Sequence, residues 1–307
     1  MQVYVCVIFG ANLRGLGNSS KSSENDYILK NELPGGRMED RMALLHVDFF
    51  SGVLGMSMQM DVILPQQTNG QIGMEGKGVQ GKIPTLYLLH GMSDDHTIWQ
   101  RRTSIERYVS DLGIAVVMPT THLGWYTDMA WGNRYWTFIS KELPEICRSF
   151  FANLSDRRED TYAAGLSMGG YGALKLGLSA SETFGMAASL SGAMDVREIG
   201  KSLDDEDGKH YWQSIFGPAD KLENSSNDLF AEAVKLKESD KPLSKLYMWC
   251  GTEDLLHEQN VSMKEHLTKL GYDLTYEESP GDHQWKYWDE KIQSVLDWIM
   301  KNRNSGL

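Results

Sequence analysis

The 307-residue sequence is poor in the features that mark several classes of protein. It has only three cysteines, Cys6, Cys147 and Cys250, with no CxxC or Cys/His spacing, so we exclude a disulfide scaffold and a zinc module. No apolar run approaches the ~20 residues of a membrane span. Lys and Arg number 30 against 42 Asp and Glu, and the formal charge of −12 argues against a nucleic-acid or anionic-membrane partner.

The N-terminal 41 residues differ in pattern from the rest of the chain. The apolar run VYVCVIFGA has no basic residue before it, so it lacks the first part of a signal peptide, and we favour a cytoplasmic protein over a secreted one. The Ser-rich stretch GNSSKSSEND that follows is typical of disorder. We expect residues 1–41 to be a disordered leader, from an upstream start or added artificially, and residues 42–307 to form one domain.

From Met42 onward, strand patterns alternate with helix patterns. Short apolar runs ending in Gly or polar residues are typical of buried parallel strands, and repeated strand–helix units predict an α/β fold with a mostly parallel central sheet and helices on both faces. The expected strands are 44–50, 56–64, 84–90, 114–119, 161–166, 185–192, 245–251 and 273–279. The expected helices are 97–111, 133–152, 168–179, 229–238, 258–270 and 287–302.

Two stretches interrupt this alternation. Residues 66–82 are rich in Gly and Gln and predict a flexible surface loop. Residues 195–240 contain an acidic cluster and predict either an inserted cap or a solvated loop.

The strongest chemical signal is a G-x-S-x-G motif, Gly165-Leu166-Ser167-Met168-Gly169. A five-residue match arises by chance in a chain with 30 glycines, but this one lies between a strand pattern and a helix pattern, as a nucleophile elbow requires. The turn is so tight that side chains two positions before and after the serine would clash. We therefore predict that Ser167 is a catalytic nucleophile at the carboxyl end of the sheet.

An oxyanion hole is expected at an earlier strand end. Hydrolases with this elbow take one backbone donor from the residue after the nucleophile, here Met168, and another from a preceding strand–loop junction. Leu89-His90-Gly91-Met92 ends an apolar strand, and Gly91 lets the chain turn so that the Met92 amide can face the site. We expect His90 to be a buried structural histidine behind this loop, not a base.

The acid and the base should follow the serine in the order Ser, Asp or Glu, His. The strand 245–250 ends in Gly251-Thr252-Glu253-Asp254, so Glu253 and Asp254 are both candidates for the acid. His283 follows the last strand and precedes an amphipathic helix, where the base is expected. His257 lies only three residues beyond Asp254, too close to turn back to it.

Neither a metal site nor a cofactor site is predicted. Asp94-Asp95-His96 superficially resembles a metal cluster, but adjacent residues on one loop rarely converge on one ion, and the sequence has no HExxH motif.

Together these motifs resemble the esterase-D-like branch of the α/β-hydrolases. The resemblance runs from about 43 to 299 and rests on LLHGMSDDHTIWQ (88–100), GWYTDMAWG (124–132), GLSMGGYGALKLGL (165–178), GTEDLL (251–256) and GDHQWKYWDEKI (281–292). It is greatest to bacterial tributyrin and acetyl esterases. The branch also contains S-formylglutathione hydrolases, feruloyl and acetylxylan esterases, and mycolyltransferases.

This resemblance implies an α/β-hydrolase fold and assigns the remaining roles. It favours Asp254 over Glu253 as the acid, and it places Gly91, Trp125 and Tyr126 beside the substrate. The implied activity is a cofactor-free serine carboxylesterase acting on acetyl to butyryl esters, including acylated sugars. Such enzymes often form homo-oligomers.

Other functions remain open at this point. Within the class they are a carbohydrate esterase (acetylxylan or feruloyl), an S-formylglutathione hydrolase and an acyltransferase. Outside it, the alternative is a non-catalytic binding protein on a hydrolase scaffold, whose usual sign is a missing triad residue.

Overall fold

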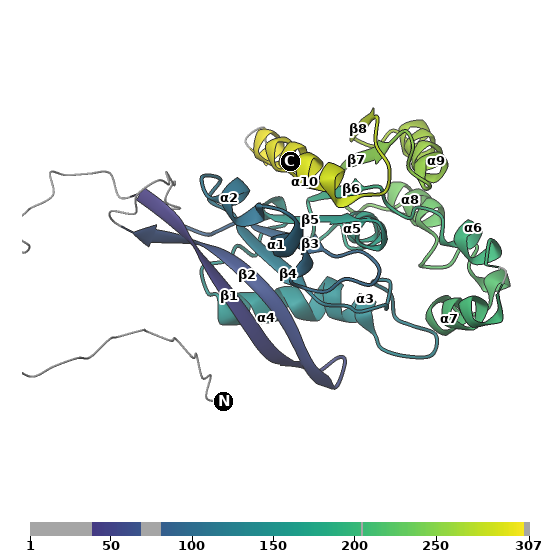
Figure 1. Cartoon of the computed structure of the whole chain (residues 1–307), viewed down its shortest axis with the longest axis horizontal. Coiled ribbons are helices and arrows are strands. Elements are labelled where there is room, and N and C mark those ends of the chain that lie inside the picture. The colour runs from purple at the N-terminus through teal and green to yellow at the C-terminus, as the bar shows by residue number, and fades with distance from the viewer. Residues whose placement is uncertain (1–38, 69–80, 204, 304–307) are drawn as a thin grey trace, which may run out of the picture. The chain divides into compact units, whose positions relative to one another are not determined.

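The computed structural model describes residues 39–68, 81–203 and 205–303. Within them, eight strands form one sheet in the order β1-β2-β4-β3-β5-β6-β7-β8 (Figure 1). The β1–β2 and β2–β4 pairs are antiparallel and all other pairs are parallel, which confirms the predicted sheet. The strands are β1 (Glu39–Ser51), β2 (Met56–Thr68), β3 (Thr85–Leu89), β4 (Ala115–Pro119), β5 (Thr161–Leu166), β6 (Met186–Leu190), β7 (Lys245–Gly251) and β8 (Leu274–Ser279).

The first two strands are longer than the sequence predicts. They pair over their whole length, from Glu39 opposite Thr68 to Ser51 opposite Met56, because backbone pairing in a hairpin continues beyond the alternating apolar pattern. The sheet therefore begins at Glu39, three residues before the expected boundary at 42. The rest of the expected leader, 1–38, and most of the expected loop, 69–80, lie outside the described residues.

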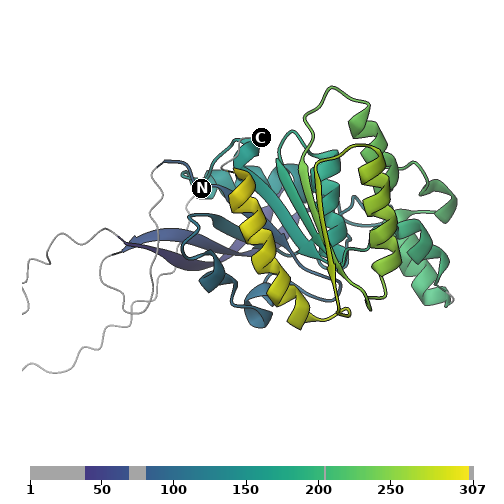
Figure 2. The ribbon, with the colours of Figure 1, turned by 90° about the horizontal axis from the view of Figure 1, so that it is seen from above.

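Helices cover both faces of the sheet, as predicted. One face carries α1 (Ile98–Arg102), α2 (Ile105–Val109) and α10 (Trp285–Arg303), and Figure 2 shows α10 in yellow crossing the strands. The other face carries α4 (Leu143–Phe150), α5 (Met168–Ser179), α8 (Leu229–Lys237) and α9 (His257–Lys269). β3 and β5 are buried along their whole length because they have a core on each side.

Two of the expected helices are interrupted. The helix expected over 97–111 breaks at Thr103, whose backbone is extended and whose hydroxyl donates to the Trp99 carbonyl at 2.5 Å. The one expected over 133–152 divides into α3 (Tyr135–Thr137), a π-helical segment (Phe138–Glu142) and α4. Pro144, in the first turn of α4, has no N–H to continue the ladder, and the π-helical segment accommodates the break.

The expected insertion is mainly helical. It contains α6 (Val196–Lys201) and α7 (Glu206–Phe216) and leads into α8, so it is not merely a solvated loop. Asp205 of the acidic cluster and the preceding Asp195 accept backbone N–H groups at the starts of α7 and α6.

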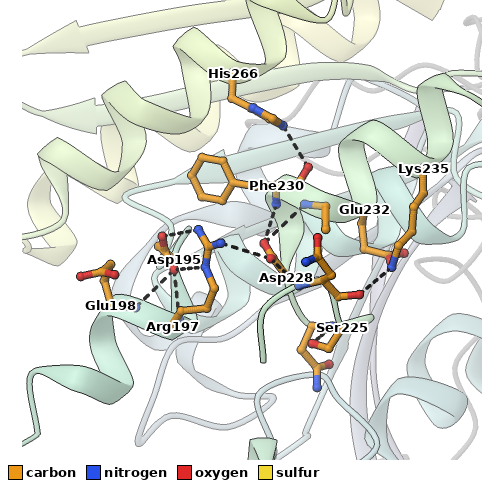
Figure 3. A network of polar contacts seen from close by, with 12 residues as sticks. Asp195, Arg197, Glu198, Ser225, Asp228, Phe230, Glu232, Lys235 and His266 are labelled. Atoms are coloured by element: carbon orange, nitrogen blue, oxygen red, sulfur yellow. Dashed lines mark hydrogen bonds and ion pairs between the residues drawn. The ribbon is translucent and has the colours of Figure 1, made fainter. Parts of the chain in front are cut away.

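An ionic network joins two helices of this insertion (Figure 3). The Arg197 guanidinium contacts the Asp195 carboxylate at 2.7 Å and that of Asp228, which caps α8, at 3.2 Å. Burial raises the pKa of Asp195, but the Arg197 guanidinium more than offsets this and lowers it. Acidic residues here cap and connect helices.

Candidate active site

Ser167 occupies a strained turn between β5 and α5. Its φ is +54°, a left-handed conformation rare outside glycine, and its N–H donates to the Leu190 carbonyl at 3.0 Å. A Cβ on Gly165 would lie 2.5 Å from the Gly169 carbonyl carbon, and one on Gly169 would lie 2.5 Å from the Leu89 oxygen. Both flanking glycines are therefore required by close backbone packing, as the motif predicts.

Three side chains predicted to act together meet at the carboxyl end of the sheet. The Oγ of Ser167 lies 3.0 Å from Nε2 of His283, and Nδ1 of His283 lies 2.9 Å from Oδ2 of Asp254. Burial raises the pKa of Asp254, but hydrogen bonds from His283 and the Leu256 N–H outweigh it, so the carboxyl remains ionised. An imidazole held this way can accept the Ser167 proton while the carboxylate stabilises its positive charge.

The alternative acid, Glu253, and the neighbouring histidine, His257, make contacts away from Ser167. The Glu253 carboxylate accepts the Gly281 N–H at 2.5 Å and so holds the loop that carries His283. His257 begins α9 and lies 3.3 Å from Glu278. Neither contacts the Ser167–His283 pair.

A backbone donor is fixed on the other side of the serine. Nε2 of His90 accepts the Thr121 N–H, so Nδ1 carries the proton and donates to the Gly91 carbonyl at 2.7 Å. The Asp94 N–H reaches the same carbonyl at 3.3 Å. Since the C=O and N–H of one trans peptide point in opposite directions, these bonds aim the Met92 N–H away from His90.

Two backbone amides beside the serine are available to an oxyanion. A Cβ on Gly91 would lie 3.7 Å from the Cβ of Ser167, so the loop packs directly against the serine. In the described part of the chain, the N–H groups of Met92 and Met168 have no hydrogen-bond partner. Unpartnered amides flanking a serine suit a developing oxyanion.

Side chains also donate hydrogen bonds to the carbonyls of the two residues before Gly91. Trp99 donates to the Leu89 carbonyl at 3.0 Å, and Tyr126 donates to the His90 carbonyl at 2.8 Å. Burial lowers the pKa of His90 to about 4, so it is neutral near pH 7 and structural, as expected.

The two aromatic residues predicted beside the substrate are placed differently from that prediction. Tyr126 has no exposed surface, so in this conformation it supports the oxyanion loop from behind and cannot touch a substrate. Trp125 is 4% exposed and its indole donates to Tyr211 of α7 at 3.1 Å. Its ring packs on that of Trp212, so it joins the insertion to the core.

One buried lysine on the helix that begins after Ser167 escaped the sequence analysis. Lys175 of α5 is fully buried, and its Nζ donates to Thr127 at 2.9 Å and to Asn227 at 2.6 Å. Burial lowers its pKa to about 7, although Glu232 and Asp128 act in the opposite direction. A lone lysine among the apolar residues of GALKLGL was the available signal.

In the loop that follows Gly91 and Met92, polar side chains bond to neighbouring protein groups. Asp95 accepts the N–H and hydroxyl of Thr97, while His96 bonds Thr120. Burial, with Asp95 nearby, raises the pKa of Asp94. No group of three potential metal ligands occurs among the described residues.

Comparison with known proteins places this geometry in a family. Residues 51–299 match the model of the Esterase family, described as "Putative esterase". The chain belongs to the Esterase family. An acetyl esterase from Caldicellulosiruptor saccharolyticus is 31% identical over 265 residues, which cover 85% of this chain and 99% of that one.

Two solved structures from Staphylococcus aureus resemble this esterase closely. The fluorophosphonate-binding serine hydrolase F is 30% identical, with a TM-score of 0.75. An S-formylglutathione hydrolase is 31% identical, with a TM-score of 0.73. Each comparison covers 85% of this esterase and 99% of the other chain.

These findings confirm the predicted α/β-hydrolase fold and the predicted class of enzyme. The chain is a serine hydrolase that acts on carboxylic ester bonds. Among its described residues, no helix has the length and apolar character needed to cross a membrane.

Proposed function

We propose that this esterase hydrolyses short-chain acyl esters, acetyl to butyryl, through a Ser167–His283–Asp254 triad and an acyl-enzyme. The observation that carries the proposal is the continuous chain of contacts at 3.0 and 2.9 Å that joins the three side chains. The similarity to an acetyl esterase, over 85% of this chain and 99% of that one, supports the short acyl group.

The proposed reaction has two halves. The Oγ of Ser167 attacks the ester carbonyl as its proton passes to Nε2 of His283, and the oxyanion accepts hydrogen bonds from the Met92 and Met168 amides. His283 then protonates the leaving alcohol. A water molecule, deprotonated by His283, attacks the acyl-enzyme, and the returned proton restores Ser167 as the acid departs.

Replacing the nucleophile tests this mechanism. Ser167→Ala should lower kcat for p-nitrophenyl acetate by at least about 10³-fold, because no acyl-enzyme can form. Circular dichroism should show an unchanged fold, and a fluorophosphonate probe should label wild type but not the variant. Undiminished turnover by Ser167→Ala would refute the triad and point to another nucleophile, whereas a wild type without turnover would be a non-catalytic binder.

A second candidate, S-formylglutathione hydrolysis, is favoured by the 31% identity to the staphylococcal enzyme. A profile of kcat/KM over p-nitrophenyl C2 to C12 esters, S-formylglutathione, methyl ferulate and acetylated xylan separates the candidates. The proposal predicts a maximum at C2 to C4. A maximum above about C8, or a much larger value for S-formylglutathione, would overturn the short-chain assignment while leaving the triad intact.

A further inference from the structure

The turn that follows β6 lies between the nucleophile and the acid. The Leu190 carbonyl accepts the Ser167 N–H at 3.0 Å, and the Ala193 N–H donates to the Ser167 carbonyl at 3.2 Å. Between them, the Ser191 N–H donates to the Trp249 carbonyl of β7, the strand that leads to the acid, at 2.8 Å. This turn therefore fixes the backbone of the nucleophile on one side and adjoins β7 on the other.

Ser191 is held in an unfavourable backbone conformation at the centre of this turn. Its φ is +47° and its side chain is fully buried. A non-glycine residue in the left-handed region costs roughly 1–2 kcal/mol, which glycine would avoid. A strained serine at this position is explained if its hydroxyl does something that glycine cannot do.

The direction of that hydroxyl is set by Trp288. Its indole Nε1 lies 3.1 Å from the Oγ of Ser191, and because an indole N–H can only donate, the serine oxygen accepts. The single hydroxyl hydrogen is then free for an acceptor. The candidates are the Asp254 carboxylate and the Cys250 thiol, because the Ser191 hydroxyl acts to lower the pKa of each group. Burial and the Asp254 charge raise the pKa of Cys250 to about 12, so the carboxylate is the stronger acceptor.

Trp288 also contacts the base directly. Its ring meets that of His283 edge to face, with centroids 4.8 Å apart and an interplanar angle of 84°. On its other side it packs edge to face on Trp285, which packs in the same way on Trp99, the residue that holds the Leu89 carbonyl. One buried tryptophan therefore touches the imidazole and donates to the Ser191 hydroxyl.

We propose that Ser191 and Trp288 are positioning residues that hold the Asp254–His283 pair in line with Ser167, through the chain Trp288 N–H to Ser191 O–H to the Asp254 carboxylate. This inference rests on the proposed triad and adds to it two residues that touch no substrate. Ser191 directly follows β6 and Trp288 lies on α10, so their hydrogen bond also joins these two elements.

Two substitutions at Ser191 separate the effect of losing the hydroxyl from the effect of relieving the backbone strain. Ser191→Ala removes the hydroxyl and keeps the strain, whereas Ser191→Gly removes the hydroxyl and relieves the strain. Both should lower kcat for p-nitrophenyl acetate by about tenfold with KM within twofold, because only the alignment of the reacting groups changes. The acidic limb of the kcat/KM–pH profile should also move upward, since a carboxylate that has lost a donor binds the proton of the pair more tightly.

Trp288→Phe tests the other end of the chain, because it keeps an aromatic edge against His283 and removes the N–H donor. We expect a similar fall in kcat. Trp298→Phe is the matched control, since Trp298 lies on the same helix and its indole donates to the Thr275 hydroxyl, also at 3.1 Å. Ser244→Ala, which removes another buried hydroxyl, controls for Ser191→Ala.

The outcomes separate this inference from the proposed function. Both controls should lose thermal stability and keep wild-type kcat. If Ser191→Gly has wild-type kcat and pH profile, or if Trp298→Phe loses as much kcat as Trp288→Phe, the positioning role is wrong even though Ser167→Ala is inactive. If Ser167→Ala is active, the proposed function itself has failed.

Discussion

The nucleophile elbow makes a sharp prediction about Gly165. A methyl group there would stand 2.5 Å from the Gly169 carbonyl carbon and 2.9 Å from the Cβ of Leu89. The Gly169 carbonyl oxygen lies closer still, and an ordinary contact begins at 3.4 Å, so the first turn of α5 must move by about 1 Å and carries the Met168 N–H with it. Gly165→Ala therefore disturbs the nucleophile and one oxyanion donor together.

The magnitude follows from that displacement. A shift of about 1 Å in reacting groups costs on the order of 10²-fold in rate, and losing an oxyanion donor costs on the order of 10²–10³-fold. Overpacking also destabilises a fold by about 1–3 kcal/mol. We expect Gly165→Ala to lower kcat for p-nitrophenyl acetate by about 10²-fold, with a smaller change in KM and a lower melting temperature.

Gly177→Ala supplies the control on the same helix. Its Cβ would meet the Cβ of Ala187 at 2.6 Å and Cδ2 of Leu246 at 3.1 Å, a comparable overlap, ten residues from Ser167. It should lose stability similarly and keep kcat within about threefold. The measurements are steady-state kinetics and denaturant unfolding of both variants. Equal kcat values for the two variants at equal stability would refute the reasoning.

Three further predictions follow from the site. Asp254→Asn should lower kcat by up to about 10⁴-fold, as loss of the orienting carboxylate does in other triads, whereas Glu253→Gln should lower kcat far less. Comparable losses of kcat in the two variants would mean that Asp254 is not the acid. His90→Leu should lower both kcat and melting temperature, because it removes the imidazole donor to the Gly91 carbonyl and leaves the buried Thr121 N–H without its acceptor. Unchanged kcat would mean that the Met92 amide needs no such support. The free energy of unfolding of wild type, relative to that of Lys175→Met, should rise between about pH 7 and 10.5 by up to about 1.4 kcal/mol per pH unit, because the unfolded chain still binds a proton that the folded protein has released. Below pH 7 the two stability curves should run parallel. A constant difference at every pH would mean that Lys175 is charged when folded.

Most of the sheet could be predicted from the sequence because its strands are short, apolar and separated by long helical patterns. The order of the elements and the parallel direction of β3 to β8 follow from that alternation. Helix continuity could not be predicted so well. The break at Thr103 depends on a side chain bonding back to the Trp99 carbonyl, and such a local bond does not alter the apolar pattern.

The residues of the candidate site could also be predicted only in part. Ser167 and His283 stand in local motifs, so each could be predicted from its neighbours. The choice of Asp254 over Glu253 rested on the family resemblance alone, because adjacent residues differ only in the direction that the folded loop gives them. Ser191 had no motif at all. Its only signal was its place at the carboxyl end of a parallel strand, and its partners are distant in the sequence.

The strands that lead to Ser167 and His283, two residues of the proposed triad, differ in how deeply they are buried. β5, which ends at Ser167, is buried at every position, whereas β8, which leads to His283, lies at the edge of the sheet and has no fully buried residue. Elements with little buried surface open locally at lower free energy than the core. We therefore expect the loop that carries His283 to open on heating before β5 does, so that activity is lost while most of the fold remains intact.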